Sequence, residues 1–192
     1  MNIANILTIM RIVLTFVFMF FLSFQGMAAK ILALAVFALA AFTDLLDGRI
    51  AHKRNMVTDF GKLMDPIADK ILVLAAFIAF VQMGLIKGWM IMIIISRELL
   101  ITSLRLFALN KGKVLSAGKA GKQKTVSQMV VIFFIMGFVI FREVRLSFFT
   151  WNPGWENFFR QGIDIFMWIT IVLTLYSGFT YLWENRRLIA NI

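Results

Sequence analysis

The stretch DLLDGRIAHKRNMVTDFGKLMDPIAD, residues 44–69, joins two long apolar segments and carries two pairs of aspartates. Asp44 and Asp47 end the first apolar segment, and Asp65 and Asp69 open the second. Spacings of three and four residues put the members of each pair on one face of a helix. Because only a short loop separates the segments, we expect antiparallel neighbours whose four carboxylates converge at one level.

Outside this stretch the chain is mostly apolar. It has 192 residues, of which 61% are hydrophobic and 16% charged, and its mean hydropathy is +0.87. Soluble domains are nearer half apolar, and a helix that crosses a membrane needs about 20 mostly apolar residues. Apolar segments lie at residues 6–24, 29–46, 67–85, 89–109, 126–141 and 163–182. We therefore predict an all-α integral membrane protein with six transmembrane helices and a single domain over residues 1–192.

Two regions outside the spans carry their own predictions. Asn5, Thr8 and Arg11 follow one another at helical spacing, which predicts a short N-terminal interfacial helix before the first span. The segment Trp151–Phe159 holds a proline, a glycine and several aromatic residues. We expect it to form an interfacial turn outside the cytoplasm.

Lysine and arginine gather in alternate loops. The strongly basic regions are residues 49–62, residues 111–124 and the C-terminus. The positive-inside rule places these regions in the cytoplasm. We therefore expect a multi-pass protein of the cell (inner) membrane, with the aspartates and both termini facing the cytoplasm. The rule, together with contacts to anionic membrane lipids, accounts for the net charge of +10 without a nucleic-acid partner.

Four carboxylates gathered at a bilayer are unfavourable. An aspartate at mid-bilayer costs roughly 3 kcal/mol, and neighbouring like charges raise one another's pKa. Divalent cations relieve both effects, and hard Mg²⁺, Mn²⁺ or Ca²⁺ suits oxygen ligands. The chain has no cysteine and only one histidine, His52, which excludes a thiolate or multi-histidine zinc site. Gly48, Ala51 and Gly61 allow the close approach of a ligand such as a metal-bound diphosphate.

The small residues and the acids form one extended pattern. It reads Asp44-x-x-Asp47-Gly48-x-x-Ala51 and then Gly61-x-x-x-Asp65-x-x-x-Asp69. This pattern resembles the motif of the CDP-alcohol phosphotransferases. The start of the chain, Asn5-x-x-Thr8-x-x-Arg11, is also similar to that family, with Ala4 where a proline is common. His52 stands where the family usually has arginine, and an imidazole holds a phosphate less firmly than a guanidinium.

The resemblance implies an enzyme with two divalent cations, Mg²⁺ or Mn²⁺, held by Asp44, Asp47, Asp65 and Asp69. It implies that Asp69 is the general base and that the protein is a homodimer. It also implies contacts with the donor CDP-diacylglycerol from Asn5, Thr8, Gly48, His52, Thr58 and Gly61. Residues 58–70, 96–98 and 121–125 look like the subfamily that joins glycerol 3-phosphate to CDP-diacylglycerol.

Arginines inside a predicted span suggest the acceptor. Arg97 and Arg105 are eight residues apart, a helical rotation of about 800°, so they fall near one face. With Lys122 and Lys124 from the next basic loop, they would suit the dianionic phosphate of glycerol 3-phosphate. Inositol phosphate would attract the same charges. The alternative is that Arg97 pairs with Glu98 or with an aspartate and that Lys122 only sets topology.

Other classes of protein use intramembrane acids. The four aspartates could pair with nearby basic residues and merely flank the spans. Membrane prenyltransferases resemble one another in having two separated Asp-rich motifs. The second half of this chain has only scattered acids, Glu143, Glu156, Asp164 and Glu184, which argues against that class. A divalent-cation transporter is the non-enzyme alternative, although repeated halves and broken helices, which transporters often have, are not visible.

Overall fold

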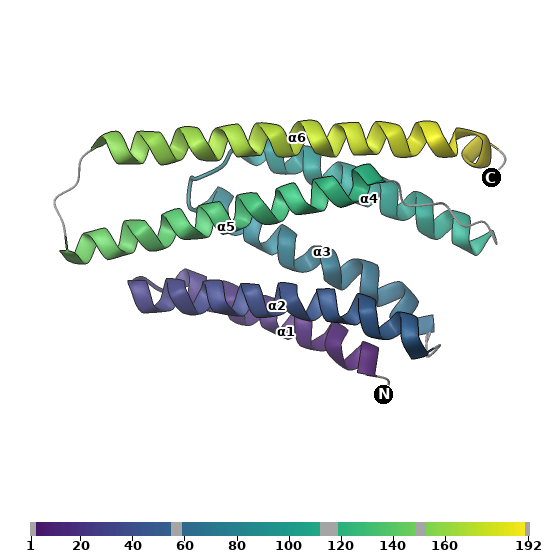
Figure 1. Cartoon of the computed structure of the whole chain (residues 1–192), viewed down its shortest axis with the longest axis horizontal. Coiled ribbons are helices and arrows are strands. Elements are labelled where there is room, and N and C mark those ends of the chain that lie inside the picture. Colours follow the sequence, from purple (N-terminus) through teal and green to yellow (C-terminus); the bar gives the residue numbers. More distant parts are fainter. Residues whose placement is uncertain (1–2, 55–58, 112–118, 149–152, 191–192) are drawn as a thin grey trace. The chain divides into compact units, whose positions relative to one another are not determined.

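The computed structural model describes residues 3–54, 59–111, 119–148 and 153–190. Its side chains are described except at residues 3–5, 7, 44–54, 59–69, 110, 119–120, 145–148, 153 and 187–190. Within these ranges there are six helices and no strand, which confirms the all-α class (Figure 1). The helices are α1 Ile3–Ser23, α2 Met27–Arg54, α3 Asp59–Gln82, α4 Gly88–Asn110, α5 Lys119–Phe148 and α6 Pro153–Ala190. Each predicted apolar segment coincides with one of them.

The first helix corrects one prediction. α1 is unbroken from Ile3 to Ser23, so the prediction of a separate short interfacial helix before the first span is wrong. The sequence between these residues contains neither glycine nor proline, and without such a residue nothing ends the helix early.

Helices also extend beyond the predicted spans elsewhere. α2 continues through Gly48 to Arg54, because one glycine weakens a helix by only about 1 kcal/mol against alanine. α5 begins at Lys119, so Lys122 and Lys124 lie in its first turns rather than in a loop. α6 begins at Pro153, since the fixed φ of proline suits the first helical position. Most of the predicted turn at Trp151–Phe159 is therefore helical.

Two short turns depend on glycine. Gly26, between α1 and α2, has a φ of 102°, and Gly84, between α3 and α4, has a φ of 67°. Residues with a Cβ adopt such angles only under strain. These positions therefore fix where α1 and α3 end.

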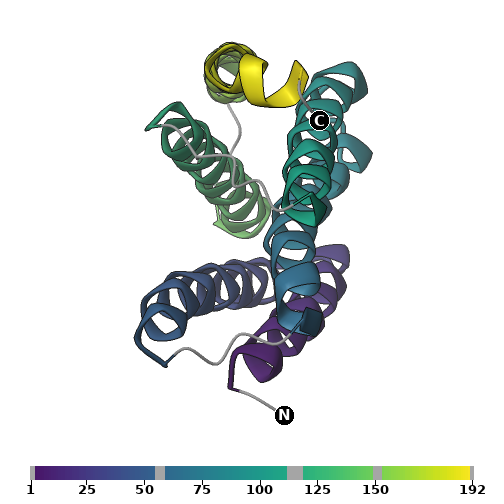
Figure 2. The same cartoon turned by 90° about the vertical axis from the view of Figure 1, so that its right-hand side faces the viewer.

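The chain divides into two compact units, each described by itself. The first comprises residues 1–80 and 133–153. In it α1 and α2 lie side by side (Figures 1 and 2). The ring of Phe37 contacts Phe18 at 5.4 Å and Phe133 at 5.5 Å between centroids. At the turn after α1, the backbone N–H of Gly26 donates to Glu143 at 3.0 Å, which ties this turn to α5.

The second unit comprises residues 81–132 and 154–192. Here α4 and α6 meet at three successive levels. Trp89 packs on Trp168 at 5.5 Å between ring centroids, Arg97 donates to Ser177 at 2.8 Å, and Arg105 lies 5.7 Å from the ring centroid of Tyr181. Contact residues that lie later in α4 meet residues that lie later in α6. The two helices therefore run parallel.

Among the described residues, two helical segments are long and apolar enough to cross a bilayer. They are Gly121–Val144 in α5 and Gly154–Arg186 in α6. Large apolar side chains on α6 stay exposed, including Phe179 at 64% and Trp168 at 52%. Such exposed apolar surface fits a lipid environment better than water. The structure thus supports membrane association, while the six crossings stay a prediction.

Candidate functional site

The four aspartates lie on two helices, as their spacing predicts. Asp44 and Asp47 belong to α2, and Asp65 and Asp69 belong to α3. Their side chains lie outside the described residues, as do those of Asn5, Gly48, His52 and Gly61, and Thr58 lies outside the described ranges altogether. Where side chains are described, no group of three acidic or histidine residues could hold a metal. The convergence of the four carboxylates therefore stays a prediction.

The donor set itself fits a divalent cation. Four carboxylates at three- and four-residue spacing along helices offer only oxygen ligands, and the sequence offers no thiolate. Hard cations such as Mg²⁺ and Mn²⁺ select such ligands. The residue types on α2 and α3 thus match the predicted cations.

Two polar residues of α1 face the interior of the first unit. Thr8 is 1% exposed and Arg11 is 3% exposed, although both lie on a mostly apolar helix. One turn further on, Thr15 donates to the backbone carbonyl of Arg11 at 2.9 Å. A polar side chain turned inward from a membrane helix indicates a structural or ligand-binding role. This is consistent with the predicted contact between Thr8 and the donor substrate.

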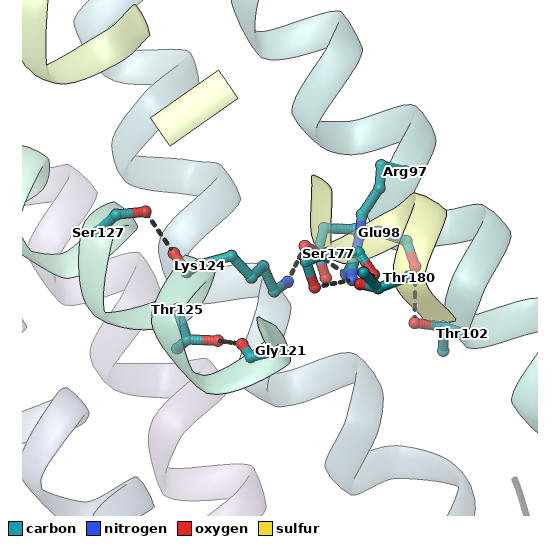
Figure 3. Close-up of polar contacts among 9 residues, drawn as sticks. All are labelled: Arg97, Glu98, Thr102, Gly121, Lys124, Thr125, Ser127, Ser177 and Thr180. Carbon is teal, nitrogen blue, oxygen red and sulfur yellow. Dashed lines mark hydrogen bonds and ion pairs between the residues drawn. The ribbon is translucent and has the colours of Figure 1, made fainter. Parts of the chain in front are cut away.

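A buried polar cluster joins α4, α5 and α6 in the second unit (Figure 3). We call Arg97, Glu98, Lys124 and Ser177 the Arg97 cluster. The Glu98 carboxylate accepts hydrogen bonds from Nζ of Lys124 and from Nη1 of Arg97, the latter at 3.3 Å. The second terminal nitrogen of Arg97 donates to Oγ of Ser177 at 2.8 Å. Three helices thus hold one guanidinium and one ammonium around a single carboxylate.

Among the described residues, the Arg97 cluster holds two cationic side chains and one carboxylate. Glu98 pairs with Arg97, which is the alternative that the sequence left open, but Lys124 joins the same carboxylate. Within the described part of the chain, two cationic side chains therefore face this one carboxylate. Ion pairs removed from water hold their geometry more tightly than surface pairs. The pairing therefore fixes the positions of the two cationic groups.

The other predicted acceptor residues are placed differently. Arg105 is exposed and stacks over Tyr181, one helical turn beyond Ser177 on α6. Lys122 is exposed and lines a groove of about 420 Å³ between α5 and α6. Lys122 and Lys124 are two residues apart, which is a rotation of about 200° on a helix. The structure thus brings Lys124 to Arg97 and turns Lys122 to another side of α5.

The sequence reasoning missed the contribution of α6. Buried polar residues recur every three or four positions along this helix: Thr170, Thr174, Ser177, Tyr181 and Asn185. Residues at this spacing share one face. We call them the polar stripe of α6. The spacing was legible in the sequence, but only the packed structure shows that this face is the buried one.

Comparisons with known proteins agree with the motif at residues 44–69. A family model described as CDP-alcohol phosphatidyltransferase matches residues 1–176. The chain is 37% identical to a CDP-diacylglycerol–glycerol-3-phosphate 3-phosphatidyltransferase of Bacillus subtilis, over 78% of this chain and 71% of that protein. It is 33% identical to a protein of the same name from Salmonella typhimurium, over 96% of this chain and 95% of that one. It is 42% identical to a probable phosphatidylglycerophosphate synthase of Mycobacterium tuberculosis, over 68% of this chain and 64% of that protein, just under two thirds of its length. The resemblance drawn from the motif is confirmed.

Proposed function

The chain belongs to the CDP-alcohol phosphatidyltransferase family, and we propose that it transfers the phosphatidyl group of CDP-diacylglycerol to glycerol 3-phosphate. The products are phosphatidylglycerophosphate and CMP, so the enzyme serves phospholipid synthesis. The names of relatives 33% and 37% identical to it specify this donor and acceptor, and the name of a relative 42% identical to it specifies this product. The observation that carries the choice of acceptor is the Arg97 cluster, a fixed cationic group within apolar helices.

The donor is assigned to the motif on α2 and α3. Members of the family use divalent cations, and we assign two, Mg²⁺ or Mn²⁺, to Asp44, Asp47, Asp65 and Asp69. When bound, such cations neutralise phosphate oxygens and hold the phosphorus for in-line displacement. The residues proposed to contact CDP-diacylglycerol are Asn5, Thr8, Gly48, His52, Thr58 and Gly61.

The reaction needs one base and one leaving group. Asp69 takes the proton from a hydroxyl of glycerol 3-phosphate. The freed oxygen attacks the phosphatidyl phosphorus, a new P–O bond forms, and the bond to CMP breaks. CMP carries away the electron pair of that bond, so no oxidant or further group is required.

The acceptor phosphate is assigned to basic residues of α4 and α5. The two cationic side chains of the Arg97 cluster and the guanidinium of Arg105 would attract a dianionic phosphate. Charge-assisted bonds from guanidinium to phosphate are strong and directional. Lys122 belongs to the proposed set as well, but its exposed position on another side of α5 predicts the smallest contribution.

The proposed setting is the inner membrane, with six crossings in a single domain over residues 1–192 and both termini in the cytoplasm. The parallel course of α4 and α6 supports this topology, because helices two apart in an up-and-down membrane protein run in the same direction. We also propose a homodimer in contact with membrane lipids, on the basis of the family resemblance.

The testing experiment is CMP release by the purified protein in detergent. The mixture holds CDP-diacylglycerol, Mg²⁺ or Mn²⁺, and in turn glycerol 3-phosphate, inositol phosphate, inositol or serine. We expect release with glycerol 3-phosphate only, its loss in Asp69→Asn, and its loss on chelation of the metal. Release with inositol phosphate instead would keep the mechanism and overturn the acceptor. No release with any acceptor, together with cation flux in liposomes, would favour a transporter.

A further inference from the structure

We propose that the phenol hydroxyl of Tyr181 donates a hydrogen bond to the phosphate of the acceptor. The inference rests on the proposed function, and it makes α6 a direct contributor to acceptor binding beside α4 and α5. Tyr181 belongs to none of the residues predicted from the sequence. Three observations carry the proposal: the state of its hydroxyl, its neighbours on α4, and the fit of α6 to Arg97.

The hydroxyl of Tyr181 is buried and unused. The residue is 5% exposed, and among the described residues its hydroxyl has no hydrogen-bond partner. Its ring packs with Ile101 and Ala108 of α4, so the side chain is held in place by apolar contacts. Buried hydroxyl groups in native proteins nearly always have a partner. A ligand that carries acceptor oxygens would supply one.

The neighbours of Tyr181 favour an anion. Arg105 lies over its ring at 5.7 Å, and Ser177, one turn earlier on the same face of α6, accepts from Arg97 at 2.8 Å. Both arginines therefore contact one α6 face within a single turn. The two guanidinium groups attract anionic oxygens. The phenol hydroxyl beside them can donate a hydrogen bond to such an oxygen.

The backbone of α6 is shaped for Arg97. A Cβ placed on Gly178 would lie 3.2 Å from Cγ and 3.5 Å from Nε of Arg97, a closer approach than a side chain tolerates easily. Nε of Arg97 is buried and, like the Tyr181 hydroxyl, has no partner in the described part of the chain. Two unused donors thus lie along the seam between α4 and α6. Phosphate oxygens accept hydrogen bonds and donate none when ionised, which complements such a pair.

The test is Tyr181→Phe, which removes one oxygen and keeps every ring contact. We expect the KM for glycerol 3-phosphate to rise about tenfold or more, the loss typical of a hydrogen bond to a charged group, with the KM for CDP-diacylglycerol within about twofold. The inhibition constant of inorganic phosphate, used as a competitor of the acceptor, should rise with it. The matched control is Tyr176→Phe, because Tyr176 is the other tyrosine of the chain and lies 57% exposed on the same helix.

Each contrary result has a distinct meaning. Unchanged KM values in an active Tyr181→Phe variant overturn the proposal and leave the proposed function standing. A variant that melts lower or does not fold assigns the hydroxyl a structural role, and this also overturns the proposal. In a third outcome, the KM for glycerol 3-phosphate rises but the inhibition constant of inorganic phosphate does not change. Tyr181 would then contact the glycerol part of the acceptor, and the assignment to its phosphate would be overturned. Absence of CMP release by the wild-type protein removes the proposed function itself.

Discussion

At the scale of single residues, Glu98 is the charge on which the Arg97 cluster depends. Its carboxylate is buried between Arg97 and Lys124, so Glu98→Gln removes the anion that both cations contact. Removing one partner of a buried pair destabilises a protein by about 3–5 kcal/mol. We expect a loss of about this size in the free energy of unfolding, measured by denaturant titration in detergent micelles.

The chain offers a matched control for this change. Glu156→Gln breaks the pair with Arg160 on α6, whose side chains are 29% and 43% exposed. Surface pairs contribute only about 0–1 kcal/mol, so this variant should unfold almost as the wild type does. Equal small losses in both variants would show that the cluster is not electrostatically coupled.

Gly178 is the second residue with a specific expectation. Gly178→Ala places a methyl group 3.2 Å from Cγ of Arg97, so the arginine side chain must move by a few tenths of an ångström. We expect the KM for glycerol 3-phosphate to rise about fivefold, an effect of about 1 kcal/mol, with little change for CDP-diacylglycerol. Gly137→Ala is the control, because a Cβ at Gly137 on α5 meets no atom within 4 Å. A similar KM for both variants would mean that the position of Arg97 does not govern acceptor binding.

At the scale of elements, the two lysines of α5 should differ in their effect on the binding of glycerol 3-phosphate. Lys124 is buried against Glu98, whereas Lys122 is exposed on another side of the helix. Lys124→Gln and Lys122→Gln remove the same charge with the same side chain. We expect the first to raise the KM for glycerol 3-phosphate about tenfold, or 1.4 kcal/mol, and the second to change it by less than about twofold. Equal effects in steady-state kinetics would show that both lysines reach the acceptor.

Helix positions were predictable from the sequence, and helix ends were not. Apolar length alone located all the helices, because a span must hold about 20 apolar residues. The ends were underestimated because α2, α5 and α6 continue into polar or charged turns, where a helix and a basic loop have similar compositions. Lys122 and Lys124 were assigned to a loop for this reason.

The candidate site also has a part that was predictable from the sequence and a part that was not. The motif at residues 44–69 is local in sequence, so it indicated the family before any packing was known. The pairing of Glu98 with Lys124 and the contacts of Arg97 with Ser177 join residues 26 and 80 positions apart. No local pattern specifies such contacts. The polar stripe of α6 was visible as spacing, but polar residues in a span become meaningful only when the buried face is known.

At the scale of the whole molecule, topology is the feature that orients the chemistry. Charge distribution predicts that the loop after α4 lies in the cytoplasm and that the loop after α3 lies on the opposite side. The parallel course of α4 and α6 agrees with a full crossing by α5 between them. The donor nucleotide and the acceptor are both water-soluble at their reacting ends, so the orientation decides on which side they can be used.

The absence of cysteine makes this orientation directly measurable. The chain has no cysteine, so single cysteines introduced at Lys87 and Lys111, exposed at opposite ends of α4, give unique labels. In intact cells, a membrane-impermeant maleimide should label Lys87→Cys and leave Lys111→Cys unlabelled until the membrane is opened. The wild-type protein, which should take up no label, is the control. Labelling of Lys111→Cys in sealed cells would place the basic end of α4 outside the cytoplasm, because a helix that crosses the bilayer exposes only one end to each side. That result would reverse the proposed topology and separate the enzyme from a cytoplasmic supply of its substrates.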